Sequence, residues 1–325
     1  MMHLGSREHH NEQKRAVGDV VTATIDGKVV TWINEYDGGD APSTVPDKQS
    51  PKDNNRVAPQ DNNRVAPPAP PQGPAPKSNP GAGSWGRQGY YNAESQTSSG
   101  LTFLNNMGGQ GSGVFDTTLG MSLSYASSDA KSGSPNPQIL ANQMLGDGDE
   151  LILMTDTPCS SSDGDCGATR PGTIAYHGFD GASKLFLLEF NMPLTGSVGW
   201  NRDMPAAWIL NAQIPRTVQY GREECSCWKT GCGEWDIFEV LDSGNTRCKS
   251  TLHADVSGGD SNYFERPTEN TVKVAVLFDR EGSKGDIVVL PDVTDFAEVL
   301  SDAQVQALIE GIAGQGEKST VRLGS

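Results

Sequence analysis

Several features that would point to other functions are missing from this sequence. No run approaches the roughly 18 apolar residues of a membrane-spanning helix, and aromatic residues make up 7% of the 325 residues. Basic residues are scarce: 25 Lys and Arg stand against 41 Asp and Glu, for a formal net charge of −16. This charge argues against nucleic acid or an anionic membrane surface as a ligand, because either would be repelled. A neutral polymer would not be repelled.

Motifs for several kinds of chemistry are also absent. The glycine-rich segment Gly108–Gly113 lacks the Lys-Ser/Thr pair of a phosphate-binding loop. Within it, Gly111-Ser112-Gly113 lacks the spacing of a hydrolase nucleophile elbow. No segment has the EF-hand calcium pattern. We expect neither a cofactor nor a bound metal ion, and a structural calcium ion on the β-fold is the alternative that stays open.

The turn-forming residues are abundant, with 38 Gly and 20 Pro. This composition is typical of many short strands joined by turns. We expect an all-β fold, a two-sheet β-sandwich of the jelly-roll type. The clearest predicted strands are Leu151–Met154, Lys184–Phe190, Ala206–Asn211, Trp235–Leu241, Lys249–Ala254, Thr271–Phe278 and Asp286–Leu290.

The sequence divides into five parts. A hairpin is predicted where Val20–Ile25 and Lys28–Ile33 flank a tight Asp-Gly turn. Residues 37–84, which follow the hairpin, are rich in Pro and Asn and contain an imperfect repeat, so we expect a disordered linker there. Near the end, Ser301-Asp302-Ala303-Gln304 forms a capping-box pattern before a short helix that would pack through Val305, Leu308 and Ile309. The predicted parts are an unstructured start (1–16), a hairpin (17–36), a disordered linker (37–84), a β-sandwich domain (85–300), and a C-terminal helix and tail (301–325).

The most informative segment is Gly-Glu-Trp-Asp-Ile-Phe-Glu, residues 233–239. Side chains alternate between the faces of a strand, so Glu234 and Asp236 share one face and Glu239 falls on the other. One extra residue, a β-bulge, would bring Glu239 back beside the other two, and bulges are enriched next to active sites. Two carboxyl groups flanking a cleft are the equipment of a retaining glycosidase. The alternative is an edge strand with a solvated acidic face.

Six cysteines allow 15 disulfide pairings: Cys159, Cys166, Cys225, Cys227, Cys232 and Cys248. Cys159 and Cys166 bracket a Ser/Asp/Gly loop, and we expect them to pair with each other. The other four surround the acidic strand and are expected to form disulfides there. A four-cysteine metal site is the alternative, but the spacing lacks the paired Cys-x2-Cys knuckles of structural zinc.

The acidic strand resembles the active-site strand of the laminarinase-like (family 16) glycoside hydrolases. Upstream, Met204–Asn211 is similar to the Pro-Ala-x-Trp strand of that group, and Leu252–Asp255 lies where the group often has a cleft histidine. Other segments resemble fungal cell-wall proteins of the target-of-SBF type, a family regarded as endo-β-1,3-glucanase-like. The similarity covers residues 85–300 and 20–36 and is clearest in Tyr90–Ala93, Leu101–Asn106, Gly108–Asp116 and Leu123–Ser127.

This resemblance implies a retaining β-1,3-glucanase. Glu234 would be the nucleophile and Glu239 the general acid and base, with Asp236 between them to keep their charges apart. The acid must hold its proton while the nucleophile stays ionised. The expected substrate-binding residues are Trp208, Trp228, His253 and Asn211. Of these, the two tryptophans are expected to stack on sugar rings. His253 could equally be an ordinary, partly buried histidine.

The family also implies a secreted, cell-wall location, and we expect a monomer. The start, Met1–Glu8, is polar and has no signal-peptide core, so we expect the signal sequence to lie upstream of it. Two other functions remain open: a wall-remodelling transglycosylase that uses the same intermediate, and a non-catalytic glucan-binding wall protein. The clustered carboxylates favour an enzyme over a binding protein.

Overall fold

The structure is a computed structural model. It describes residues 2–6, 20–25, 28–33, 81–108, 112–113, 115–116, 120–159, 166, 173–211, 233–254, 260–279, 281, 283–310 and 318–323.

The chain forms two compact units, residues 9–70 and residues 1–8 with 71–325. In the first unit, β2 (Val20–Ile25) and β3 (Lys28–Ile33) pair antiparallel from end to end, at the residues predicted for the hairpin. The predicted linker lies, up to residue 80, outside the described residues.

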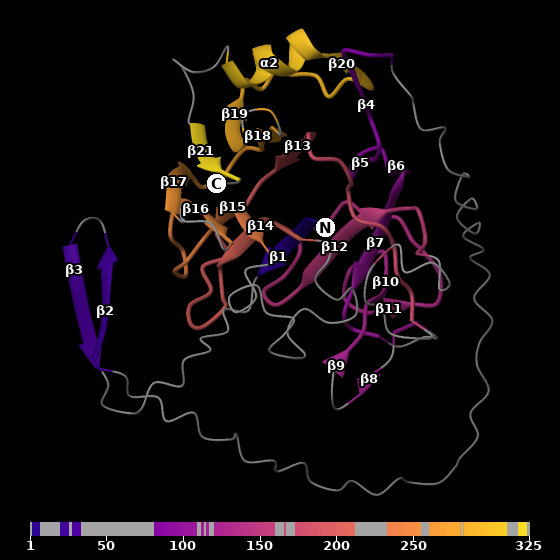
Figure 1. The fold of residues 1–325 in the computed structure, drawn as a ribbon. Coiled ribbons are helices and arrows are strands. Elements are labelled where there is room, and N and C mark those ends of the chain that lie inside the picture. Colours follow the sequence, from indigo (N-terminus) through magenta and orange to yellow (C-terminus); the bar gives the residue numbers. More distant parts are fainter. Residues whose placement is uncertain are drawn as a thin grey trace, which may run out of the picture. The chain divides into compact units, whose positions relative to one another are not determined.

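The larger unit is a two-sheet β-sandwich with one short helix among its described residues, which confirms the predicted fold class. Its nine-stranded sheet has the order β11-β10-β7-β12-β1-β14-β15-β16-β17 (Figure 1). These strands are β1 (Met2–Ser6), β7 (Leu101–Asn105), β10 (Ser124–Ala126), β11 (Gly133–Ser134), β12 (Glu150–Thr155), β14 (Pro205–Leu210), β15 (Glu234–Glu239), β16 (Arg247–His253) and β17 (Asp260–Glu265). The jelly-roll connectivity stays a prediction.

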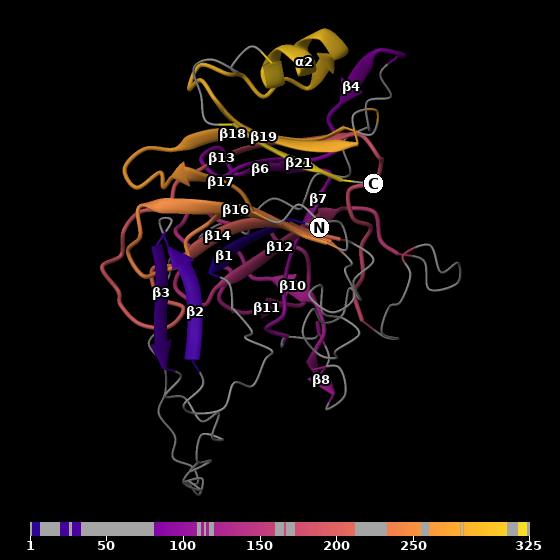
Figure 2. The same ribbon diagram turned by 60° about the vertical axis from the view of Figure 1, so that its left-hand side comes forward.

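The second sheet has four strands and lies against the first, with the helix on its outer side (Figure 2). Its order is β13 (Lys184–Phe190), β18 (Val272–Asp279), β19 (Lys284–Leu290) and β21 (Lys318–Arg322). The described part of this unit also contains three two-stranded pairs: β4 (Ser84–Gly86) with β20 (Val299–Ser301), β5 (Tyr90–Asn92) with β6 (Thr97–Ser99), and β8 (Phe115–Asp116) with β9 (Gly120–Met121). No described helix is long and apolar enough to cross a membrane.

Two predicted boundaries need correction. The start was expected to be unstructured, but β1 pairs antiparallel with both β12 and β14 inside the large sheet. The C-terminal part was expected to be a helix and tail, but β21 pairs with β19 and completes the small sheet. In both cases backbone hydrogen bonds to an open strand edge compensate for a weak local pattern.

The predicted capping box is confirmed at the start of α2 (Asp302–Glu310). The Ser301 backbone N–H donates to Gln304 Oε1 at 2.9 Å, and the Gln304 N–H donates to Ser301 Oγ at 3.3 Å. Val305 and Ile309 are buried against the outer face of the small sheet, with Leu308 partly buried beside them. The helix therefore covers that face, and its role is packing.

The main core lies between the two sheets, and Trp235 of β15 is its largest contribution from the acidic strand. The indole packs edge-on against Phe278 of β18, with ring centroids 5.3 Å apart. It also lies over Gly285 of β19, where an added Cβ would come within 2.5 Å of the ring. Only a glycine leaves room for this tryptophan.

We expect Gly285→Ala to lower the free energy of unfolding by about 1–2 kcal/mol, because the methyl group overpacks the core against Trp235. Urea unfolding followed by tryptophan fluorescence measures the change. Gly81→Ala is the control, since a Cβ there meets nothing within 4 Å. Equal stability of the two variants would contradict the packing described for Trp235.

Candidate active site

The acidic strand β15 contains the predicted bulge. Asp236 pairs with Trp208 of β14, and the next β14 residue, Ala207, pairs with Phe238. Ile237 is therefore an extra residue that is not paired with any residue of β14. The register between β15 and β16 shifts in the same stretch, between Asp236 and Glu239.

The bulge sorts this segment into two chemically distinct faces. Its apolar residues lie in the core between the sheets: Trp235, Ile237, Phe238 and Val240. With one residue added to the alternation, Glu234, Asp236 and Glu239 share the opposite face. All three are buried, with 2%, 0% and 4% of their surface exposed. The solvated edge strand that was the alternative interpretation is excluded by this burial and by the two neighbouring strands.

His253 of β16 joins this cluster. It lies opposite Glu234 in the sheet, and its Nε2 is 3.0 Å from Asp236 Oδ2. One oxygen of Glu234, one of Asp236 and a ring nitrogen of His253 all lie within 4.8 Å of one another. His253 is part-buried while Asp236 is completely buried, so the imidazole connects the acidic residues to the more open side of the cluster.

The predicted substrate-binding residues have different outcomes. Trp208 is on the acidic face but is 0% exposed, so it offers no open ring to a sugar. Asn211 is exposed just beyond β14, where its N–H donates to the Gly233 carbonyl at 2.9 Å, beside the start of β15. Trp228 lies outside the described residues.

The same face continues across the sheet as an apolar patch. Leu210 lies opposite Glu234 and packs in a cluster with other aliphatic side chains: Leu104, Leu123, Ile152 and Met154. Tyr125 and Tyr176 border this cluster with their hydroxyl oxygens 2.9 Å apart. Burial raises the pKa of the Tyr176 phenol, so this hydroxyl stays protonated.

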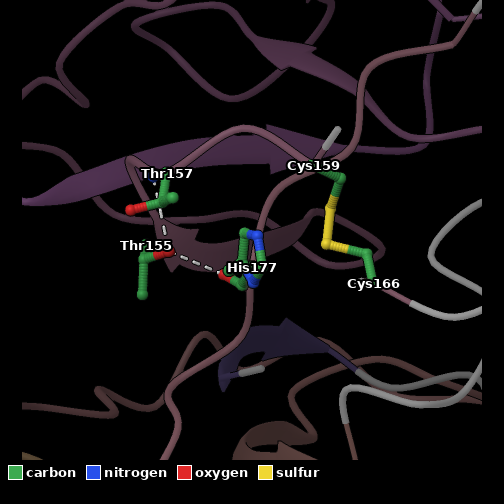
Figure 3. The surroundings of a disulfide bond; sticks show 5 residues. All are labelled: Thr155, Thr157, Cys159, Cys166 and His177. Atoms are coloured by element: carbon green, nitrogen blue, oxygen red, sulfur yellow. Dashed lines mark hydrogen bonds between the residues drawn. A yellow bond between two sulfur atoms is a disulfide. The ribbon is translucent and has the colours of Figure 1, made fainter. Parts of the chain in front are cut away.

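A disulfide lies next to the segment that contains Tyr176. Cys159 and Cys166 are bonded, which confirms that predicted pair (Figure 3). The Cys159 N–H donates to the Ala175 carbonyl at 2.9 Å, and Thr155 Oγ1 donates to the His177 carbonyl at 2.9 Å. These bonds hold the disulfide segment against the residues on either side of Tyr176.

The remaining predicted disulfides are untested. Cys248 is buried in the core, with its Sγ 3.9 Å from Met192 Sδ. Cys225, Cys227 and Cys232 lie outside the described residues. The alternative of a four-cysteine metal site likewise stays open for these positions.

Two further residues of this face were not singled out from the sequence. Lys249 of β16 lies opposite Glu239, and Tyr263 of β17 lies opposite Lys249. Simple alternation along β16 could have identified Lys249, since Lys249, Thr251 and His253 are two residues apart. Tyr263 lies in another strand, and its place depends on the pairing of β17 with β16.

Comparison with known proteins gives the following matches. A family model for the C-terminal part of cell wall protein YJL171C/Tos1 matches residues 83–308. The chain is 47% identical over 238 residues to a protein of Candida albicans named probable circularly permuted 1,3-beta-glucanase TOS1, covering 70% of this chain and 50% of that protein. It is 41% identical over 334 residues to a probable circularly permuted 1,3-beta-glucanase of Arthroderma benhamiae, covering 99% of this chain and 74% of the relative.

The chain thus spans about half the length of the Candida relative. A similar match, 46% identity over 222 residues, is found to TOS1 of Saccharomyces cerevisiae, covering 68% of this chain and 48% of that protein. Among solved structures, an endo-1,3-beta-glucanase from Streptomyces sioyaensis matches 70% of this chain and 86% of its own, with 20% identity and a TM-score of 0.25.

Glu234, Asp236 and His253 also have the donor types of a metal site with two carboxylates and one imidazole. We expect them to act without a metal, because the His253 ring nitrogen already faces the Asp236 carboxylate at hydrogen-bond distance. The purified protein should contain only substoichiometric metal by mass spectrometry, and a chelator should leave its melting temperature unchanged. Stoichiometric metal that is lost in His253→Phe would contradict this expectation.

Proposed function

Because this chain belongs to the family of cell wall proteins YJL171C/Tos1, we propose that it is a glycoside hydrolase that cleaves β-1,3-glucan with retention of configuration. The observation that supports this most directly is the bulge at Ile237, which gives Glu234, Asp236 and Glu239 a common face. The names of the relatives, probable 1,3-beta-glucanases, support the same substrate class.

In the proposed mechanism, the two glutamates divide two chemical roles. Glu234 attacks the anomeric carbon and forms a covalent glycosyl-enzyme while the glycosidic bond breaks. Glu239 first donates a proton to the leaving oxygen, and then removes a proton from the water that hydrolyses the intermediate. A completely buried residue, Asp236, separates them in the strand.

Asp236 and His253 are proposed to position the pair. The 3.0 Å contact between His253 Nε2 and Asp236 Oδ2 fixes the direction of the Asp236 carboxyl group. Asp236 is completely buried and lies between the two glutamates in the strand, so its carboxyl group would stay between them during the reaction.

The acidic surface agrees with a neutral polysaccharide as substrate. Residues 81–325 contain 16 Lys and Arg against 31 Asp and Glu, a net charge of −15, which a glucan tolerates and a polyanion does not. We further propose that the protein acts in the cell wall as a secreted monomer that needs no cofactor. The family match to cell wall proteins supports that location.

The division of roles predicts an asymmetry between two variants. Glu234→Gln should abolish hydrolysis of β-1,3-glucan, because the nucleophile is needed for every substrate. Glu239→Gln should lose about 10²- to 10⁴-fold on glucan, but much less on an aryl glycoside whose leaving group needs no proton. Azide should restore turnover of Glu239→Gln and give a β-glycosyl azide, identified by NMR.

Asp242→Asn is the matched control, since it removes an exposed carboxylate just after β15 and should leave the rate unchanged. If both glutamate variants match the parent protein on laminarin, the carboxylates are not catalytic and the glucan-binding function becomes the better proposal. Products longer than the added laminari-oligosaccharide would instead identify a transglycosylase with the same intermediate.

A further inference from the structure

A row of side chains leads away from the proposed acid along the acidic face. Glu239, Lys249 and Tyr263 are directly opposite one another in β15, β16 and β17. Directly paired residues point to the same face of a sheet. Phe264, the next residue after Tyr263, is buried in the core and stacks on Phe238. Tyr263 therefore faces the same side as the carboxylates.

Tyr263 is the aromatic residue of this row, and it is open to solvent. It is 43% exposed, in contrast to the completely buried Trp208. Strand spacing puts it two strands from Glu239, or about 10 Å along the sheet. A substrate that crosses the strands at Glu239 would extend over Tyr263 with a neighbouring sugar residue.

Two cations of β16 lie against the ring. The Arg247 guanidinium carbon is 4.5 Å from the ring centroid, and Lys249 Nζ is 5.8 Å from it. Both cations are at distances where the ring attracts them. Each cation also presents N–H donors beside an aromatic surface, and this is the combination that suits the hydroxyl groups and the apolar face of a pyranose.

We propose that Tyr263, Arg247 and Lys249 form a sugar-binding subsite next to the catalytic carboxylates. The ligand is a neutral glucan chain. One of its pyranose rings stacks on Tyr263, and the hydroxyl groups of that sugar accept hydrogen bonds from Arg247 and Lys249. This inference rests on the proposed function, since it assigns a second contact to the same substrate. It replaces the buried Trp208 as the stacking residue.

A structural role is the competing explanation. β17 is at the end of the nine-stranded order, and charged side chains commonly protect sheet edges from association. In that case the ring and its cations would affect solubility and stability, and glucan would not contact them. The two explanations differ in how the effect of a variant depends on substrate length.

The test compares kcat/KM across laminari-oligosaccharides of increasing length. Tyr263→Thr removes the ring but keeps a residue suited to a strand. We expect a loss of about three- to tenfold, the size of one aromatic contact, for chains long enough to reach the subsite. The shortest chain that is cleaved should react at the parent rate. Tyr263→Phe should retain the binding of long chains, because the ring remains.

Tyr90→Thr is the matched control. Tyr90 also has an arginine over its ring, with the Arg87 guanidinium carbon 4.4 Å from the centroid, but it belongs to the separate β5–β6 pair. Removing it should change no kinetic constant at any chain length. Melting temperatures of all variants separate loss of fold from loss of binding.

Calorimetric binding of laminarihexaose to Glu234→Gln, with and without Tyr263→Thr, tests the subsite when no turnover occurs. Weaker binding in the double variant supports the subsite. Equal binding, or a kinetic loss that is the same at every chain length, overturns it. An inactive parent protein that still binds the hexasaccharide through Tyr263 would refute the proposed hydrolysis and leave the subsite intact.

Discussion

One strand has to meet two opposite demands, and the extra residue at Ile237 is what reconciles them. The core between the sheets takes Trp235, Ile237 and Phe238 from this segment. The other face takes three carboxylates from the same six residues. Strict alternation would direct either a glutamate into the apolar core or a phenylalanine into the acidic cluster. A buried, unpaired charge costs far more than the loss of one ladder hydrogen bond at a bulge.

The core side of this strand is therefore as constrained as the acidic side. Trp235 occupies the space left by Gly285 in the opposite sheet, and Phe238 stacks on Phe264 with ring centroids 4.7 Å apart. These contacts fix the position of β15 relative to the opposite sheet and its register with the neighbouring strands. The carboxylates on its other face are then held by packing and not by flexible loops, as a preorganised site requires.

The connections at the ends of the site strands are held by a buried ion pair. Arg266 Nη2 lies 2.5 Å from Asp203 Oδ1, and the same guanidinium donates to the carbonyls of Met192, Pro193 and Asn245. These residues come from the segment before β14, the turn after β15 and the end of β17. One arginine at the end of β17 thus provides hydrogen-bond donors for carbonyl groups of two other connections. Nothing in the local sequence identifies Arg266, because its partners come from distant positions.

The features that could be predicted from sequence are those whose cause is local. The bulge followed from a clash between residue types and strand alternation, the hairpin from an Asp-Gly turn, and the α2 cap from four adjacent residues. The strand character of Met2–Ser6 could not be predicted, because it depends on two open edges that exist only in the folded sheet.

The same distinction applies within the site. A tryptophan beside the acidic strand suggests a sugar platform, but the exposure of a ring depends on how the neighbouring strands cover it. Trp208 lies in β14, which has a neighbouring strand on each side, and it is completely buried. Tyr263 lies at the end of the order and keeps an open surface. In the proposed function the three carboxylates would act from inside the sheet, whereas a polymer would also have to be held by residues at the open border of the same face. The row Glu239, Lys249 and Tyr263 would meet both requirements, because it runs from a strand with a neighbour on each side to the last strand of the order.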